Sequence, residues 1–302
     1  MNETLNKINA LKKKKNAVIL AHYYTSPKVQ TLADFVGDSY YLAKAARGTD
    51  ADTVVFAGVS FMGESAKLLC PDKRVLMPDL SSDCAMAHMA SAEKIRRMRE
   101  EYPDLAVVCY INSTAQLKCE CDVCVTSSNA VKIVKNLPNK NIYFIPDGNL
   151  GAFVKEQVPE KNIILCDGFC PIHAAVTGEE VEEAKRRHPN ALVLSHPECK
   201  KEVLDLSDFI GSTSDILKFA KESEGEEFII STEEGVLYPL SLDNPNKSFY
   251  FVKEGFVCPD MKLNTPEKIL RVLETGENEV LLDEEKAARA MRPLDRMLEM
   301  AK

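Results

Sequence analysis

Three of the ten cysteines recur at nearly equal spacing along the chain. Cys84, Cys170 and Cys258 lie 86 and 88 residues apart, and each follows an apolar segment that is typical of a β-strand. Three thiolates are one fewer than the four ligands of a closed structural zinc site. On a [4Fe–4S] cluster they would leave one iron free to act as a Lewis acid on a substrate hydroxyl or carbonyl. A single cysteine is more often a small buried hydrophobic residue, so the regular spacing is what favours one cluster per chain.

The remaining cysteines carry weaker signals. Cys119, Cys121 and Cys124 form a CxCxxC pattern that could be a local metal clip, but Cys124 falls inside the apolar strand VCVTSS and is interpreted as a packing residue. Cys119 and Cys121 are interpreted as loop thiols. Cys166 and Cys170 form CxxxC without a following CxxC, which argues against the three-cysteine motif of radical S-adenosylmethionine enzymes.

Polar residues occur in pairs, two positions apart, at the end of another predicted strand in each third of the chain. Alternate residues share one face of an extended strand, so each pair is expected to point into the same space as the cysteines. Equivalent positions are again 88 and 86 residues apart. A lone histidine at a strand end is more often structural than catalytic, and only the repeated placement raises these residues above that expectation. The pairs are His22 with Tyr24, Tyr110 with Asn112, and His196 with Glu198.

Hydroxyl residues precede predicted helices at matching positions. Ser39, Ser127 and Thr213 are separated by 88 and 86 residues, and Ser212 stands beside Thr213. Such a hydroxyl can cap its helix, which contributes about 1 kcal/mol. It can equally donate to an anion, because helix N-termini offer free N–H groups and a positive dipole end. Three such ends around one cavity would suit a small substrate with several negative charges.

All these positions belong to a larger internal repeat with a period of 86 to 88 residues. Each copy contains four short apolar strands separated by helical segments, which predicts an α/β fold with parallel sheets. Right-handed crossovers place the strand ends of each sheet on one edge, where open α/β sheets bind ligands. We therefore expect three quasi-equivalent three-layer αβα units with pseudo-threefold symmetry around a central active site. Their expected bounds are residues 1–88 with the C-terminal helix in 259–302, residues 89–173 and residues 174–258.

Composition limits the partners. The chain has 302 residues, of which 45% are apolar, enough for a sizeable core. A formal charge of −8 and a pI near 5.4 supply no positive field for nucleic acid or an anionic bilayer, and no segment reads as a signal peptide or a membrane span. We expect a cytoplasmic protein that binds neither nucleic acid nor membranes. Neither a P-loop nor a GxGxxG after a strand is present, so ATP or NAD binding is not predicted.

The motifs HYY, FVGDS, GVSFMGES, YINST, TSSNA, PDGNLG, CPIH, HPEC and GSTS occur in this order. Together with the late Cys258 they resemble the quinolinate synthase family, over a span from about Val18 to about Asn264. The resemblance implies condensation of iminoaspartate with dihydroxyacetone phosphate to quinolinate, with release of phosphate and water, in de novo NAD biosynthesis. It also implies a functional link to an enzyme that produces iminoaspartate. One departure is Tyr23, since many members have HNY in the first motif.

The resemblance further implies residue roles. Cys84, Cys170 and Cys258 would bind the [4Fe–4S] cluster, and Glu198 would be the acid–base carboxylate. The implied catalytic residues are Glu198, Tyr24, Tyr110, His22 and His196, and the implied substrate contacts are His22, Tyr24, Ser39, Tyr110, Asn112, Ser127, His196, Glu198, Ser212 and Thr213. Two alternatives stay open: a cluster-dependent hydro-lyase acting on a small hydroxy acid, and a non-enzymatic anion-binding or iron-sensing protein.

Overall fold

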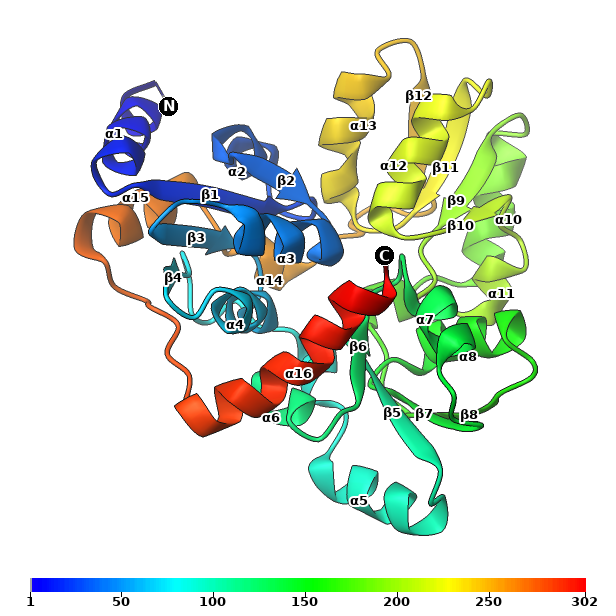
Figure 1. Cartoon of the computed structure of the whole chain (residues 1–302). Helices are drawn as coiled ribbons and strands as arrows, with labels where there is room; N and C mark the ends of the chain where they lie inside the picture. The colour runs from blue at the N-terminus through cyan, green and yellow to red at the C-terminus, as the bar shows by residue number, and fades with distance from the viewer. Residues whose placement is uncertain (1) are drawn as a thin grey trace.

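The computed structural model describes residues 2–302, which fold into three four-stranded parallel β-sheets interleaved with helices (Figure 1). The strand order is β2-β1-β3-β4 in the first sheet, β6-β5-β7-β8 in the second and β10-β9-β11-β12 in the third. Every strand pair is parallel, so the predicted α/β class with parallel sheets is confirmed. The strands are β1 (Ala17–His22), β2 (Phe35–Gly37), β3 (Thr53–Ala57), β4 (Arg74–Leu76), β5 (Leu105–Tyr110), β6 (Val123–Val125), β7 (Asn141–Ile145), β8 (Asn162–Leu165), β9 (Leu192–Ser195), β10 (Phe209–Ile210), β11 (Glu227–Ser231) and β12 (Ser248–Phe251).

Helices connect the strands and complete the two ends of the chain. The longer helices are α1 (Asn2–Lys14), α3 (Ser39–Gly48), α4 (Ser60–Leu69), α5 (Ala92–Glu101), α8 (Gly148–Gln157), α10 (Gly178–Arg187), α12 (Thr213–Glu222), α15 (Pro266–Thr275) and α16 (Glu284–Met300). The shorter ones are α2 (Pro27–Leu32), α6 (Ala115–Lys118), α7 (Ala130–Asn136), α9 (Pro171–Ala174), α11 (Lys201–Leu204), α13 (Leu237–Asp243) and α14 (Pro259–Lys262), with the 3₁₀ turns η1 (Ala85–His88) and η2 (Glu234–Val236).

The central strands are buried on both faces. In β1, Val18 and Leu20 pack into the largest hydrophobic cluster, whereas Ile19 and Ala21 pack into a separate one on the opposite face. All of β5 is buried in the same way. Because parallel sheets are covered by helices on both sides, their strands read as continuous apolar runs rather than alternating ones. This explains why short apolar segments, and not period-two patterns, mark the strands in the sequence.

The strand order determines where the chain can present functional side chains. In each sheet the chain crosses from the first strand to a neighbour on one side, and then back over it to a neighbour on the other side. In such sheets the crevice outside the carboxyl end of the central strand is the usual ligand site. The residues that follow β1, β5 and β9 therefore occupy the place where a site is expected.

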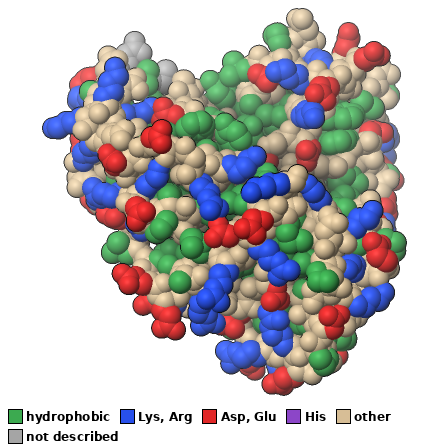
Figure 2. All heavy atoms as spheres, viewed as in Figure 1, with side chains coloured by type: hydrophobic (Ala, Val, Ile, Leu, Met, Phe, Trp, Pro, Cys, Tyr) green, Lys and Arg blue, Asp and Glu red, His purple; other side chains and the backbone are tan. Residues whose placement is uncertain are grey.

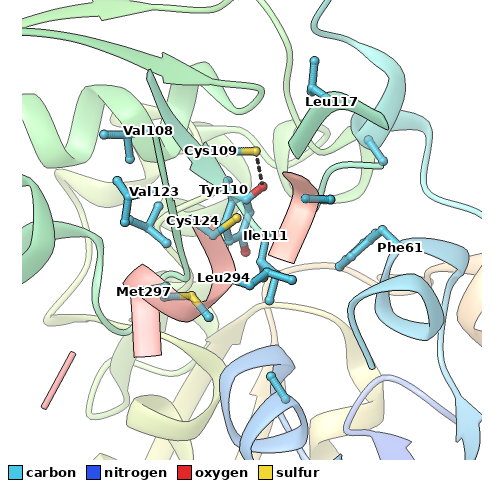
Figure 3. Packing of buried hydrophobic residues seen from close by; sticks show 14 of the residues in the cluster. Phe61, Val108, Cys109, Tyr110, Ile111, Leu117, Val123, Cys124, Leu294 and Met297 are labelled. Carbon is cyan, nitrogen blue, oxygen red and sulfur yellow. Dashed lines mark hydrogen bonds between the residues drawn. The ribbon is translucent and has the colours of Figure 1, made fainter. Parts of the chain in front are cut away.

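The C-terminal helix α16 spans two of the sheet units. It packs against α4 from the first unit and against α6 and β6 from the second. Its Leu294 and Met297 have no exposed surface and belong to the same hydrophobic cluster as Val123 and Cys124 of β6 (Figure 3). The C-terminal helix therefore connects the first two sheet units (Figure 1).

The surface carries charges of both signs. Lys, Arg, Asp and Glu side chains are interspersed over the face shown in Figure 2. Among residues 2–302, no helix combines the length and the apolar character needed to cross a membrane.

Candidate active site

A central cavity of about 270 Å³ is lined by residues from all three sheet units. Twelve predicted site residues line it: His22, Tyr24, Ser39, Cys84, Tyr110, Asn112, Ser127, Cys170, His196, Glu198, Thr213 and Cys258. Ser212 does not line the cavity. Its hydroxyl instead accepts from the backbone N–H of Asp215 at 3.2 Å and caps α12. Every predicted site residue except Ser212 therefore lines this cavity.

The three cavity cysteines share one local structure. Cys84, Cys170 and Cys258 each occupy the N-cap position of a short helical turn, η1, α9 or α14, in extended backbone conformation. Burial raises the pKa of Cys84 to about 12 and that of Cys258 to about 11, while backbone N–H groups of the following turns lower both. Burial also raises the pKa of Cys170, which the N–H of His173 opposes. These N–H groups can stabilise a thiolate bound to a metal, as hydrogen bonds to cluster sulfurs do.

The three cavity thiols line one common space. The negative charge of Cys258 contributes to the raised pKa of Cys84, and that of Cys84 contributes to the raised pKa of Cys170, after the larger effect of burial in each case. Three cysteines that line one cavity have the sulfur-donor chemistry of an iron–sulfur site. The residues present therefore fit the predicted cluster. Cys124, by contrast, is fully buried within β6 and does not reach the cavity.

The two predicted histidines are held in one tautomer. The backbone N–H of Tyr24 donates to Nδ1 of His22 at 3.1 Å, and the N–H of Glu198 donates to Nδ1 of His196 at 3.3 Å. With Nδ1 as acceptor, each neutral ring carries its proton on Nε2. Nε2 of His196 lies 3.2 Å from the hydroxyl of Ser127. Burial lowers the pKa of His22 to about 3 and that of His196 to about 4, so both rings are neutral N–H donors near pH 7.

Glu198 is buried and carries two strong hydrogen bonds. Its Oε1 accepts from the hydroxyl of Tyr110 at 2.6 Å, and its Oε2 lies 2.8 Å from Nδ1 of His173. Burial alone would raise the pKa of this carboxyl, but the rings of His196 and His173 and the two hydrogen bonds outweigh burial and hold the pKa well below its usual range. Glu198 is therefore an ionised carboxylate that is almost fully buried.

The sequence analysis missed His173 and Thr232, which join the predicted residues into one chain of hydrogen bonds. The hydroxyl of Tyr24 is 2.8 Å from that of Thr232, which is 3.0 Å from Nε2 of His173. One assignment satisfies every contact: Tyr24 donates to Thr232, Thr232 to His173, and both His173 and Tyr110 to Glu198. The chain links two tyrosines from different sheet units through a central carboxylate.

A sequence signal for His173 existed in the motif CPIH. A residue three positions after a helix-capping cysteine returns to the same side of the turn, and Nδ1 of His173 lies 3.2 Å from Sγ of Cys170. Ligand atoms of Cys170, His173 and Glu198 all lie within 4.8 Å of one another, which is close enough to share a metal ion. Thr232 has no comparable signal, because its partners come from other units of the fold.

Apart from Ser212, the predicted hydroxyl residues at helix starts do not cap their helices. Asp38 caps α3 by accepting from the N–H of Tyr41 at 2.9 Å, and Ser212 caps α12, so neither Ser39 nor Thr213 is needed as a cap. Ser127 lies in the turn before α7, whose N-cap residue is Asn129. All three hydroxyls face the cavity, where a polar ligand can accept hydrogen bonds from them.

Comparisons with known proteins give a consistent result. Residues 6–299 match the family model described as quinolinate synthetase A protein. A quinolinate synthase of Clostridioides difficile is 51% identical over 294 residues, covering 97% of both chains. Quinolinate synthases of Fusobacterium nucleatum and Caldicellulosiruptor bescii are 52% and 51% identical over 295 residues, covering 98% of this chain and 98% and 97% of theirs.

Proposed function

We infer that this chain, which belongs to the quinolinate synthetase A family, is an enzyme that synthesises quinolinate for NAD biosynthesis. The proposed reaction condenses iminoaspartate with dihydroxyacetone phosphate and releases phosphate and water. The observation that carries the proposal is the convergence of histidine, tyrosine, glutamate, hydroxyl and thiol groups from three sheets on one cavity. A functional link to an iminoaspartate-producing enzyme follows from the chemistry of the first substrate.

We further propose that the three sheet units are quasi-equivalent αβα domains related by pseudo-threefold symmetry. The identical strand order of the sheets supports this arrangement. So does the placement of Cys84, Cys170 and Cys258 at equivalent helix N-caps. The proposed bounds are residues 1–88 with 259–302, residues 89–173 and residues 174–258.

The three cavity cysteines are proposed to hold one [4Fe–4S] cluster. All three line the same cavity and occupy equivalent helix N-cap positions, which supports that assignment. When bound, the cluster supplies an iron without a protein ligand, which can polarise a substrate hydroxyl or carbonyl. Substrate binding and proton transfer are assigned to the side chains of the cavity.

Substrate binding is assigned to uncharged hydrogen-bond donors: hydroxyl groups, an amide and neutral imidazole rings. Ser39 and Thr213 lie in the first turns of α3 and α12, where free N–H groups and the positive helix dipole favour an anion. Ser127, Asn112 and the Nε2–H groups of the two histidines line the same space. Together they offer hydrogen bonds to the phosphate of one substrate and the carboxylates of the other without adding buried positive charge.

Proton transfer is assigned to Glu198 and the tyrosines attached to it. A condensation removes a proton from carbon, and the later loss of water delivers one to a hydroxyl, so a group that exchanges protons within the cavity is required. Glu198 is ionised and can accept the first proton. Through His173 and Thr232 it connects to Tyr24, and directly to Tyr110, so protons can move between two sides of the cavity without entering bulk water.

Anaerobically purified protein tests this function. The proposal predicts iron and sulfide in the purified chain, and quinolinate formation only when iminoaspartate and dihydroxyacetone phosphate are both supplied. A hydro-lyase would turn over a single hydroxy acid without dihydroxyacetone phosphate. Turnover of that kind, or an iron-loaded protein without quinolinate formation, would overturn the assignment.

A further inference from the structure

Glu233 is a fully buried carboxylate directly behind one of the cavity cysteines. It lies two residues after β11, and its Oε1 accepts from the backbone N–H of Cys258 at 3.0 Å. Its Oε2 accepts from the N–H of Gly235 at 2.7 Å. The same Oε1 is 2.7 Å from Nζ of Lys262, at the end of α14. Both oxygens of the carboxylate thus accept hydrogen bonds, and Lys262 pairs its negative charge.

The partner of Glu233 leads to the substrate side of the cavity. Nζ of Lys262 also donates to the backbone carbonyl of Tyr24 at 2.8 Å. The segment around Tyr24 packs closely on the turn held by Glu233, because a Cβ built on Gly235 would lie 2.4 Å from the carbonyl oxygen of Tyr23. One carboxylate therefore connects the Cys258 loop of the third unit with the Tyr24 segment of the first.

The Cys84 loop contains a related contact. Oδ1 of Asp83 accepts from the N–H of Cys84 at 2.8 Å. Oδ1 of Asp147 instead accepts from the N–H groups of Asn149 and Leu150, at 2.9 and 3.0 Å. Asp147 and Glu233 are 86 residues apart, the period of the repeat, and both lie two residues after the third strand of their sheets. Asp147 thus occupies the position of Glu233 in its own unit, whereas Glu233 is hydrogen-bonded to the cysteine loop and, through Lys262, is connected to the Tyr24 segment.

We propose that Glu233 is a positioning residue that couples the cluster-binding loop of Cys258 to the segment that carries Tyr24, so that occupancy of the cavity and retention of the cluster reinforce each other. The inference rests on the proposed function. Its physical basis is a chain of contacts. A ligand that orders Tyr24 also orders Lys262, which contacts the Tyr24 carbonyl, and Glu233, which pairs with Lys262. Glu233 in turn accepts from the backbone N–H of Cys258 and so holds the Cys258 loop in place. Residues that hold metal ligands in this way typically change metal affinity by about 10- to 100-fold when they are replaced.

The variant Glu233→Gln isolates the contact. An amide has one acceptor oxygen, so it cannot accept from both Cys258 and Gly235, and it cannot form an ion pair with Lys262. The matched control is Glu234→Gln, because Glu234 is the next residue, is partly exposed and lines a different groove on the outside of the protein. Both variants remove one negative charge, so a difference between them reports on the contact rather than on net charge.

The measurement is the rate of iron release to an Fe(II) chelator under anaerobic conditions, with and without saturating quinolinate, in the cluster-loaded full-length protein. We expect quinolinate to slow release in the unmodified protein and in Glu234→Gln. We expect Glu233→Gln to release iron about tenfold faster or more and to lose the protection by quinolinate. The spectrum of the reduced cluster in electron paramagnetic resonance should change in Glu233→Gln alone.

The variant Lys262→Met separates the effect of Glu233 on the Cys258 loop from its connection to Tyr24. It also provides the test if Glu233→Gln does not fold. It keeps both backbone hydrogen bonds of Glu233 but breaks the connection to Tyr24, so protection by quinolinate should be lost while release without ligand changes less than in Glu233→Gln. Unchanged protection in both variants would overturn the coupling, as would unchanged release in Glu233→Gln. An unmodified protein without iron would instead overturn the proposed function, and the two failures are therefore distinguishable.

Discussion

At the scale of single residues, the cavity is a set of neutral donors arranged around one ionised acid. His22 and His196 donate from Nε2 because a backbone N–H occupies Nδ1 in each ring. Glu198 stays charged because Tyr110 and His173 donate to its two oxygens. The histidines and hydroxyls are therefore assigned to substrate binding, and Glu198 is assigned to proton exchange.

The first residue-scale prediction concerns Glu198→Gln. The amide preserves size and part of the hydrogen bonding but cannot take up a proton, so the variant should keep its iron and bind substrates while quinolinate formation falls by about 10²- to 10⁴-fold. Iron analysis and a quinolinate assay on the same preparation measure both effects. Near-normal quinolinate production would exclude Glu198 as the acid–base residue and move that role to His22, Tyr24 or His196.

A second residue-scale prediction follows from the buried neutral histidines. Their folded pKa values, about 3 for His22 and about 4 for His196, lie below the unfolded value near 6.5. Above pH 6.5 neither state binds the proton, and as the pH falls toward 4 only the unfolded state does. Stability is therefore lost with falling pH in this window, by up to roughly 1.4 kcal/mol per pH unit for each histidine.

The matched variant for this prediction is His196→Gln, which removes one titrating ring. Denaturant unfolding of the cluster-free protein at pH 7, 6 and 5 should show a shallower fall of the unfolding free energy in the variant than in the unmodified protein. Equal slopes would mean that His196 is not held neutral in the folded state.

At the scale of elements, the sequence predicted the repeat well because a parallel strand is a short apolar run and each copy preserves the order of four such runs. It could not tell which hydroxyl caps a helix. Ser212 and Thr213 are adjacent in the sequence, yet only the backbone conformation at the start of α12 makes Ser212 the N-cap. Ser39 could be read as a cap, but the neighbouring Asp38 has that role for α3.

The element-scale prediction compares Ser39→Ala with Ser212→Ala. Loss of a capping hydroxyl costs about 1 kcal/mol, so Ser212→Ala should lower the unfolding free energy by that amount. Ser39→Ala removes a cavity donor but no cap, so it should leave stability nearly unchanged and weaken binding of dihydroxyacetone phosphate. Thermal unfolding and calorimetric titration of both variants distinguish the roles. A drop in stability for Ser39→Ala with unchanged affinity would make Ser39 a structural residue.

At the scale of the whole molecule, function depends on contacts between units that no local pattern encodes. Thr232 follows the third strand of its unit like many loop residues, and it acquires a role only because Tyr24, 208 positions earlier, lies against it. Glu233 likewise contacts Lys262, which in turn reaches Tyr24. Spacing predicted which side chains would face the centre, whereas the partners across the unit boundaries required the folded arrangement.

The convergence of the three cysteines is the claim on which the account depends most. Iron and acid-labile sulfide per chain, measured on anaerobically purified variants, test it directly. Cys84→Ala, Cys170→Ala and Cys258→Ala should each lose the cluster, because each leaves two protein ligands. Cys119→Ala and Cys121→Ala should retain it, since neither residue lines the cavity. Normal iron and sulfide in the Cys258 variant, together with their loss from the Cys121 variant, would contradict the account.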